Sequence, residues 1–169
     1  DLIINNENID KIRSFYGTEI KIDSVLCKRN YGFNKSKNSS EYFSEKWHYD
    51  GSPIYNFKLF IILKKTTLDH GPFHIHNIEN SKKINFMGYK NRRNYGNVEI
   101  DEIEGLYKMT GNPGLMVLAN TNYCIHRASI PKENYFRDII VFQISLSDKP
   151  FDIKNWKFNL KKKGIDKKN

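Results

Sequence analysis

Cysteine, long apolar runs and internal repeats are scarce or missing in this chain of 169 residues, and each shortage excludes a class of protein. Two cysteines cannot build the disulfide framework of a small secreted domain, so we expect a reducing, cytoplasmic compartment. No run of about 18 apolar residues occurs, which excludes a membrane-spanning helix. The N-terminal residues lack the pattern of a signal peptide, although a start at Asp1 rather than Met is typical of a trimmed chain or a mature fragment.

Acidic residues are also in short supply, with 19 Asp and Glu against 28 Lys and Arg, which gives a net charge of +9. Part of this excess lies in residues 154–168. A solvated tail explains such a run, and attraction to nucleic acid, an anionic membrane or a charged substrate is the alternative. Aromatic residues are plentiful, and a chain of this length can bury about two-thirds of its unfolded surface in one core. We therefore expect one domain over residues 1–150 and a basic tail over residues 151–169.

One histidine and one aspartate stand two residues apart in the stretch Trp47–Gly51. Side chains alternate across a β-strand, so His48 and Asp50 are expected on the same face. A third candidate, His126, follows 78 residues later in a run that is typical of two strands joined by an Asn-Thr-Asn turn. This set is typical of the 2-His-1-carboxylate facial triad, which holds Fe(II) and leaves one face of the metal open. The alternative is that His48 is a half-buried strand histidine bonded to a neighbour.

The order of the segments resembles the phytanoyl-CoA dioxygenase-like branch of the Fe(II)/2-oxoglutarate oxygenases, over residues 46 to 146. The resemblance is carried by the His-x-Asp stretch, the apolar strand after it, a glycine-to-strand step, a glycine-rich turn and a downstream arginine, at residues 47–51, 56–63, 69–75, 111–118 and 137. It implies that His48, Asp50 and His126 hold Fe(II), that 2-oxoglutarate takes two open positions and that O2 takes the third. Relatives carry a longer N-terminal helical region that helps to roof the substrate pocket, so the resemblance does not name a substrate.

The resemblance also implies contacts to the cosubstrate. Arg137 stands eleven residues after His126, where this branch keeps the arginine that binds the far carboxylate of 2-oxoglutarate. A guanidinium suits this task because it is a planar, always-charged fork. The family often places a hydroxyl two residues after the distal histidine. Here Ala128 stands at that position and Ser129 follows it, so Ser129 is the candidate. The alternative for Arg137 is a surface arginine paired with a nearby acidic residue.

The implied reaction is hydroxylation of a C–H bond with release of succinate and CO2. Halogenases of this superfamily resemble hydroxylases whose carboxylate ligand is replaced by a small residue, so the presence of Asp50 favours hydroxylation. We expect a small-molecule or carrier-bound substrate, and a negative charge on it would match the basic segment 82–93. Two alternatives stay open. One is a related oxygenase that acts on a macromolecule, either a protein or an alkylated nucleic acid, and the other is a non-enzymatic cupin-like binding module.

Other residues near these motifs have competing interpretations. His70, His74 and His76 fall within seven residues and form an alternative metal cluster, although we expect them to lie near the pocket mouth. Cys124 either shares the face of the distal histidine near the metal or is a small buried apolar side chain. The segment 82–93 contains Gly, Asn and Tyr among its basic residues, which predicts a mobile loop that grips the substrate.

The hydrophobic alternation predicts a mainly β fold. A short helix is expected over residues 7–16, a strand over 18–27 and a polar loop over 30–41. Further strands are expected near residues 46–50, 56–64, 72–77, 105–110, 114–119, 123–129 and 136–146. Eight short strands separated by turn residues favour a double-stranded β-helix, the jelly-roll barrel of cupin-like proteins, with a short N-terminal helix.

Overall fold

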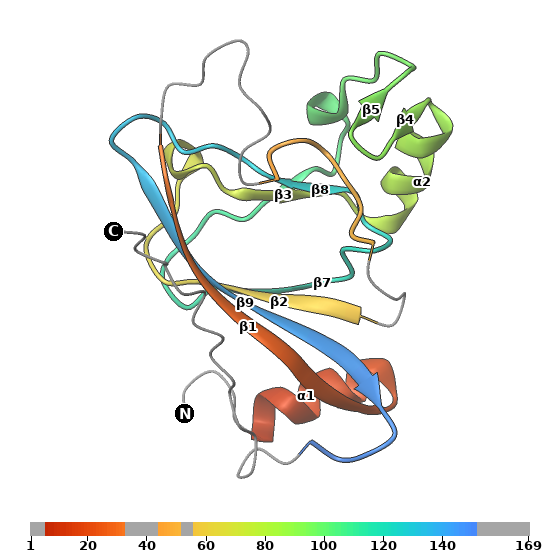
Figure 1. The fold of residues 1–169 in the computed structure, drawn as a ribbon, viewed down its shortest axis with the longest axis vertical. Helices are drawn as coiled ribbons and strands as arrows, with labels where there is room; N and C mark the ends of the chain where they lie inside the picture. The colour runs from red at the N-terminus through yellow and green to blue at the C-terminus, as the bar shows by residue number, and fades with distance from the viewer. Residues whose placement is uncertain (1–5, 33–43, 52–55, 152–169) are drawn as a thin grey trace, which may run out of the picture.

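The computed structural model describes residues 6–32, 44–51 and 56–151. Nearly all of the predicted basic tail and most of the predicted polar loop lie outside these residues. The described chain is mainly β with a short N-terminal helix, as the sequence predicts (Figure 1). None of its helices combines the length and the apolar character needed to cross a membrane.

The described helices are α1 (Asn6–Tyr16) and α2 (Ile78–Phe86), with 3₁₀ turns at Leu68–His70 and Ile100–Glu102. The strands are β1 (Glu19–Tyr31), β2 (Asn56–Ile62), β3 (Phe73–Ile75), β4 (Tyr89–Lys90), β5 (Arg93–Asn94), β6 (Tyr107–Lys108), β7 (Met116–Ala119), β8 (His126–Ala128) and β9 (Phe136–Ser147). The strand predicted at 46–50 is reduced to a single bridge at His48, and the strand predicted at 105–110 is reduced to β6.

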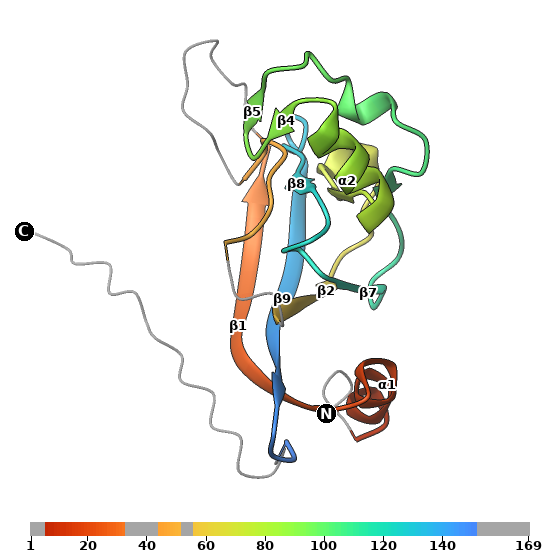
Figure 2. The same ribbon diagram turned by 90° about the vertical axis from the view of Figure 1, so that its right-hand side faces the viewer.

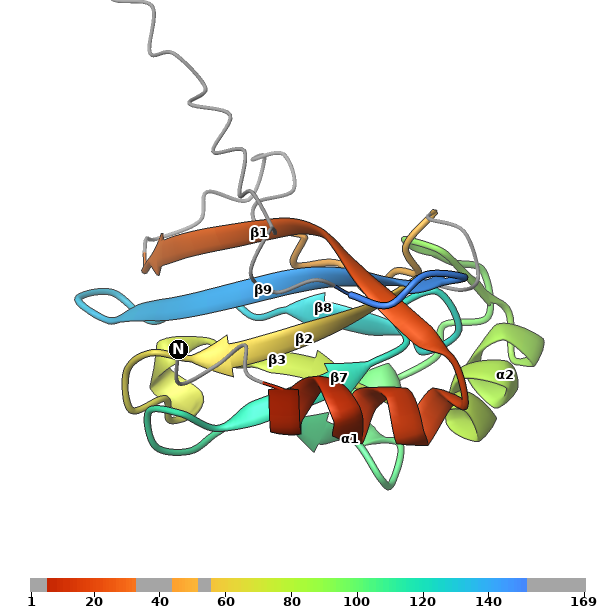
Figure 3. The same ribbon diagram turned by 90° about the horizontal axis from the view of Figure 1, so that it is seen from below.

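The larger sheet has four antiparallel strands in the order β1–β9–β2–β7. The central strand β9 alternates apolar residues between its two faces, as expected for a strand buried on both sides. On one face, Phe57, Phe142 and Ile144 form a core with Ile9 of α1. Helix α1 therefore covers the outer face of this sheet, and Figure 3 shows it lying beside β1 and β2.

The smaller sheet has the order β6–β3–β8, and the bridge between His48 and His126 extends it by one more segment. Its inner face packs on the inner face of the larger sheet. The rings of Phe60 on β2 and Phe73 on β3 stack with their centroids 4.2 Å apart and belong to one core cluster. The two sheets thus face each other, with apolar side chains filling part of the space between them.

A β-bulge in β1 decides which of its side chains face the smaller sheet. The register of β1 against β9 shifts between Ile22 and Ser24, which leaves Asp23 as an extra residue. The hydroxyl of Ser145 donates a hydrogen bond to the Asp23 carboxylate and so holds the bulge. Side chains alternate along a strand, so one extra residue moves every later side chain to the opposite face. Beyond the bulge, the side chains that face the smaller sheet are those of residues 24, 26, 28 and 30.

Residues 82–93, which the sequence predicts to be a mobile loop, are folded. Helix α2 runs to Phe86, and β4 pairs with β5 in a short hairpin. Asn77 caps the helix by accepting a hydrogen bond from the backbone of Asn80 at 2.8 Å. Ile84 is fully buried in a cluster with Trp47, so one apolar contact anchors an otherwise polar helix. This region lies at the end of the molecule opposite to α1 (Figure 2).

Candidate metal centre and cavity

The structure brings His48, Asp50 and His126 together. His48 and His126 face each other across two backbone hydrogen bonds of 2.9 and 3.0 Å. The Asp50 Oδ1 atom lies 3.9 Å from His48 Nε2 and 3.7 Å from His126 Nε2. These are the residues in the described part of the chain that can offer three ligand atoms to one metal ion, all within 4.8 Å of one another. Two neighbouring segments of one sheet thus supply the whole set.

Both histidines are held in the orientation and tautomer that a metal needs. The Nδ1 atom of His48 lies 2.8 Å from the Lys46 carbonyl, and that of His126 lies 3.0 Å from the Cys124 carbonyl. A carbonyl can only accept, so each Nδ1 carries a proton, and Nε2 is the ring atom of each histidine that faces Asp50 and can bind a metal. Burial, followed by the nearby His48, lowers the pKa of His126 to about 4, so this ring is neutral at pH 7.

Lys58 of β2 holds the Asp50 carboxylate from the other side. The Lys58 ammonium donates to Asp50 Oδ2 at 2.5 Å, while Oδ1 faces the two histidines. Burial opposes ionisation of Asp50, but hydrogen bonds from Lys58 and Thr121 outweigh it and hold the pKa of this carboxyl below its usual value. The donor set of two imidazoles and one carboxylate fits the facial triad of non-haem Fe(II).

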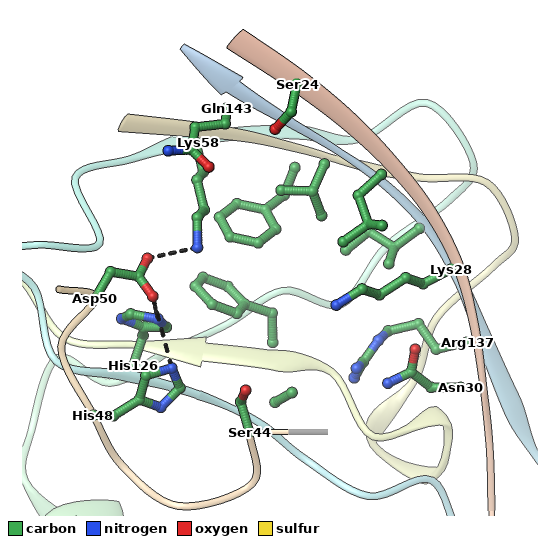
Figure 4. Close-up of a pocket in the computed structure, with 16 residues that line it drawn as sticks. Ser24, Lys28, Asn30, Ser44, His48, Asp50, Lys58, His126, Arg137 and Gln143 are labelled. Atoms are coloured by element: carbon green, nitrogen blue, oxygen red, sulfur yellow. Dashed lines mark hydrogen bonds and ion pairs between the residues drawn. The ribbon is translucent and has the colours of Figure 1, made fainter. Parts of the chain in front are cut away.

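The triad lies beside a cavity of about 250 Å³ between the two sheets (Figure 4). The larger sheet lines it with inward side chains in cross-strand rows. Starting nearest Asp50, these rows are Ser24–Gln143–Lys58, Leu26–Val141–Phe60, Lys28–Ile139 and Asn30–Arg137. We call the first the polar row and the second the apolar row. The cavity therefore has a polar end beside Asp50, an apolar middle and a cationic far end.

Arg137 stands at the far end, away from the triad (Figure 4). It is only 4% exposed, and burial lowers the pKa of this guanidinium to about 10, which leaves it charged at pH 7. Its Nη1 donates to the Ser129 carbonyl at 3.3 Å, while its Nε has no partner in the described structure. Lys28 lines the cavity on the same side, and burial together with the positive charges of Lys58 and Arg137 lowers its pKa. A buried cation without an acidic partner is costly unless an anion joins it.

The other candidate residues lie outside the cavity. The Ser129 hydroxyl, the predicted second contact to the cosubstrate, lies 3.2 Å from His74 Nε2 and does not line the cavity. His74 and His76 point to the outer side of β3, because the inward positions belong to Phe73 and Ile75, and this corrects their expected place at the pocket mouth. They form no metal-ligating group with His70 in the described structure.

Two further expectations concern Cys124 and the basic segment. The Cys124 side chain is half-buried against the core between the sheets, as in the apolar interpretation, and only its carbonyl bonds to His126. Residues 82–93 contribute nothing to the lining of the cavity, so they do not form the substrate grip that we expected. The sequence analysis missed Lys58, although a single charged residue in the otherwise apolar strand β2 is a visible signal of a special position.

No protein-family model matches the sequence, and no curated protein matches it. Solved structures share its fold. ThoJ, a non-heme monooxygenase in complex with nickel, has a TM-score of 0.54 and 11% identity, over 84% of this chain and 51% of that chain. EctD from S. alaskensis with 2-oxoglutarate and 5-hydroxyectoine has a TM-score of 0.56 and 15% identity, over 92% and 56%. HygX from Streptomyces hygroscopicus with iron bound has a TM-score of 0.52 and 11% identity, over 88% and 68%.

This chain therefore spans about half the length of ThoJ and EctD. Another HygX structure holds nickel and 2-oxoglutarate. The TM-scores establish a shared fold, and the low identities do not single out the phytanoyl-CoA dioxygenase-like branch. The chain has the fold of non-heme, iron- and 2-oxoglutarate-binding oxygenases and carries a His48–Asp50–His126 group suited to a metal.

Proposed function

We propose that this protein is an Fe(II)/2-oxoglutarate-dependent dioxygenase that hydroxylates a small-molecule or carrier-bound substrate. One observation carries the proposal. The Nε2 atoms of His48 and His126 converge with Asp50 Oδ1 beside a cavity whose far end holds Arg137, a buried cation that has no acidic partner among the described residues. A metal at one end and a carboxylate-binding cation at the other match the two ends of 2-oxoglutarate.

The roles of the protein groups follow from their places. His48, Asp50 and His126 would hold Fe(II), and Arg137, oriented by the Ser129 carbonyl, would bind the far carboxylate of 2-oxoglutarate. The apolar row would contact the methylene groups of the cosubstrate and exclude water from them. The two facing sheets would form the double-stranded β-helix of this superfamily, here in its phytanoyl-CoA dioxygenase-like form.

The bound iron and cosubstrate would supply the oxidation, while the protein positions them and keeps water out. In this reaction class a substrate C–H bond becomes C–OH and 2-oxoglutarate loses CO2 to become succinate. One oxygen atom of O2 enters the new hydroxyl group and the other enters succinate. Because the carboxylate of Asp50 is present, hydroxylation is favoured over halogenation. A cytoplasmic location remains a prediction from the two cysteines, which are unpaired.

The size of the cavity favours a small substrate. Its volume of about 250 Å³ is below the range of about 300–1,000 Å³ that is usual for drug-sized ligands. Structures of EctD and HygX hold 5-hydroxyectoine and hygromycin B, which are small molecules. Since the basic segment 82–93 packs away from the cavity, no described contact favours a macromolecular substrate.

Anaerobic titration with Fe(II) and then 2-oxoglutarate tests the proposal. We expect a weak visible charge-transfer band on addition of 2-oxoglutarate to the iron-loaded protein. The band should be missing in His126→Ala and retained in His70→Ala, a matched control that removes a histidine bonded to Thr67 outside the cavity. A folded protein that binds neither iron nor 2-oxoglutarate would refute the enzyme assignment and leave a cupin-like binding module as the better interpretation.

A further inference from the structure

The polar row lies beside the metal-binding end of the cavity, and the proposed function gives a role only to its Lys58, which holds Asp50. Gln143 pairs in register with Ser24 on one side and with Lys58 on the other, so the three side chains project side by side from β1, β9 and β2. Figure 4 shows Ser24 and Gln143 near Lys58, on the opposite side of the cavity from Arg137. The bulge at Asp23 is what turns Ser24 toward this space.

The polar row is too far from Arg137 to share one carboxylate with it. The Cα atoms of Gln143 and Arg137 are six residues apart on β9, roughly 20 Å along an extended strand, and the two side chains enter the cavity at its opposite ends. The apolar row lies between them. A cosubstrate that joins the metal to Arg137 would therefore leave the polar row exposed to a second ligand.

The polar row offers the groups that recognise an anion. The Lys58 ammonium has three N–H donors, and the structure uses one of them on Asp50 Oδ2. The Gln143 amide and the Ser24 hydroxyl add neutral donors, and neither side chain makes a hydrogen bond within the described residues. Donors of this kind, with one full charge at the centre, suit a carboxylate better than a neutral or cationic group.

The charge of the whole cavity points the same way. Its described lining contains three cations, Lys28, Lys58 and Arg137, against one carboxylate, Asp50, which is a formal charge of +2. A divalent metal and a doubly charged cosubstrate cancel each other and leave this excess in place. An organic anion as substrate would reduce it.

We propose that Ser24, Gln143 and Lys58 form the subsite that binds the carboxylate of the organic substrate, which makes that substrate a small organic acid. The subsite holds the acid group beside Asp50 and so presents a nearby carbon to the metal position. This inference rests on the proposed function for its catalytic meaning. The binding of a carboxylate to the polar row can nevertheless be measured without metal.

The test compares propionate with propionamide by ligand-observed NMR titration, first on metal-free protein and then on protein loaded with Ni(II) and 2-oxoglutarate. We expect propionate to bind at least about tenfold more tightly than propionamide in both forms, as one charge-assisted hydrogen bond would give. Lys58→Met should remove this preference. Because Lys58 contacts Asp50, Gln143→Leu and Ser24→Ala serve as variants that spare the metal ligand, and each should weaken propionate several-fold.

Lys28→Met is the matched control, because it removes a lysine cation from the other end of the same cavity. Lys28→Met should leave the binding of propionate unchanged and weaken the binding of 2-oxoglutarate, because Lys28 lines the cavity on the side of Arg137. Equal binding of propionate and propionamide would overturn the subsite, and so would a preference lost in Lys28→Met but kept in Lys58→Met. If 2-oxoglutarate fails to bind while propionate still depends on Lys58, the oxygenase proposal fails and the anion subsite stands. If 2-oxoglutarate binds and propionate does not, the oxygenase proposal stands and the anion subsite fails.

Discussion

Single residues carry most of the chemistry of this site, and several were visible in the sequence. The pair His48 and Asp50 stands two residues apart, and both side chains line the cavity although the segment forms only one bridge. Arg137 was identified through the family resemblance and is buried at the far end of the cavity. Lys58 was not identified, because one lysine in an apolar strand does not reveal which carboxylate it meets.

We expect Arg137→Met to weaken the binding of 2-oxoglutarate by at least about tenfold while the affinity for Ni(II) stays nearly constant. The reason is that the guanidinium would contact the cosubstrate and not the metal. The free energy of unfolding without ligands should stay the same or rise, since methionine replaces a buried cation that lacks an acidic partner. Isothermal titration and urea unfolding measure the two effects.

Arg29→Met is the control for this variant, because it removes an exposed arginine paired with Asp138 and should leave cosubstrate binding unchanged. Equal losses of metal and 2-oxoglutarate affinity in Arg137→Met, or no loss of either, would show that Arg137 has a structural role.

Among the elements, β1 shows how a local irregularity serves the cavity. Before Asp23, Ile20 and Ile22 face the core under α1, and after it the mostly polar set at residues 24, 26, 28 and 30 faces the cavity. A regular strand could place only one of these sets correctly, because every second side chain shares a face. The bulge lets one strand contribute both to the core under α1 and to all four rows of side chains that line the cavity.

Deletion of Asp23 should therefore be far more damaging than its replacement. The deletion should lower the free energy of unfolding by roughly 3 kcal/mol or more, since it either buries polar side chains against α1 or turns Ile20 and Ile22 away from their core. Asp23→Ala keeps the bulge and loses the bond to Ser145, at a cost of about 1 kcal/mol. Urea unfolding measures both, and equal midpoints for the two variants would contradict this account of the bulge.

In the molecule as a whole, a bound metal would join two distant parts of the chain. The segment at 48–50 and strand β8 are far apart in the sequence, and they meet at one β-bridge and through the side chains of His48, Asp50 and His126. A ligand that binds only the folded state stabilises it by mass action. Metal binding should therefore appear as thermal stability of the entire domain.

We expect Ni(II) at about 100 times its Kd to stabilise the protein by about 2.7 kcal/mol, which corresponds to a rise in Tm of roughly 5–10 °C. In Asp50→Asn the rise in Tm on addition of Ni(II) should be only a small fraction of the rise in the unchanged protein, because the amide cannot supply the negatively charged ligand. Scanning calorimetry with and without metal gives the shift for each protein. The same rise in both proteins would mean that nickel binds elsewhere.

The sequence by itself determined the residue types of the site, the mainly β class and the paths of the longer strands. The period-2 alternation at residues 136–146 and the spacing of His48 and Asp50 are local properties, so one chain segment suffices to predict them. The sequence could not predict the fold of residues 82–93. The helix there buries Ser81 and Ile84 against parts of the chain that are distant in the sequence, so its stability depends on tertiary contacts.

Tertiary structure alone decided which faces meet. The bulge at Asp23 turns Ser24 and Lys28 toward the cavity, and the pairing of β1 with β9 places Asn30 beside Arg137. The tertiary structure also places the Ser129 hydroxyl next to His74 and away from the cavity. The direction of a side chain depends on register with strands far away in the sequence, and a shift of one residue reverses it. For that reason the candidate metal-binding group could be predicted from the chain, while the polar row beside it could not.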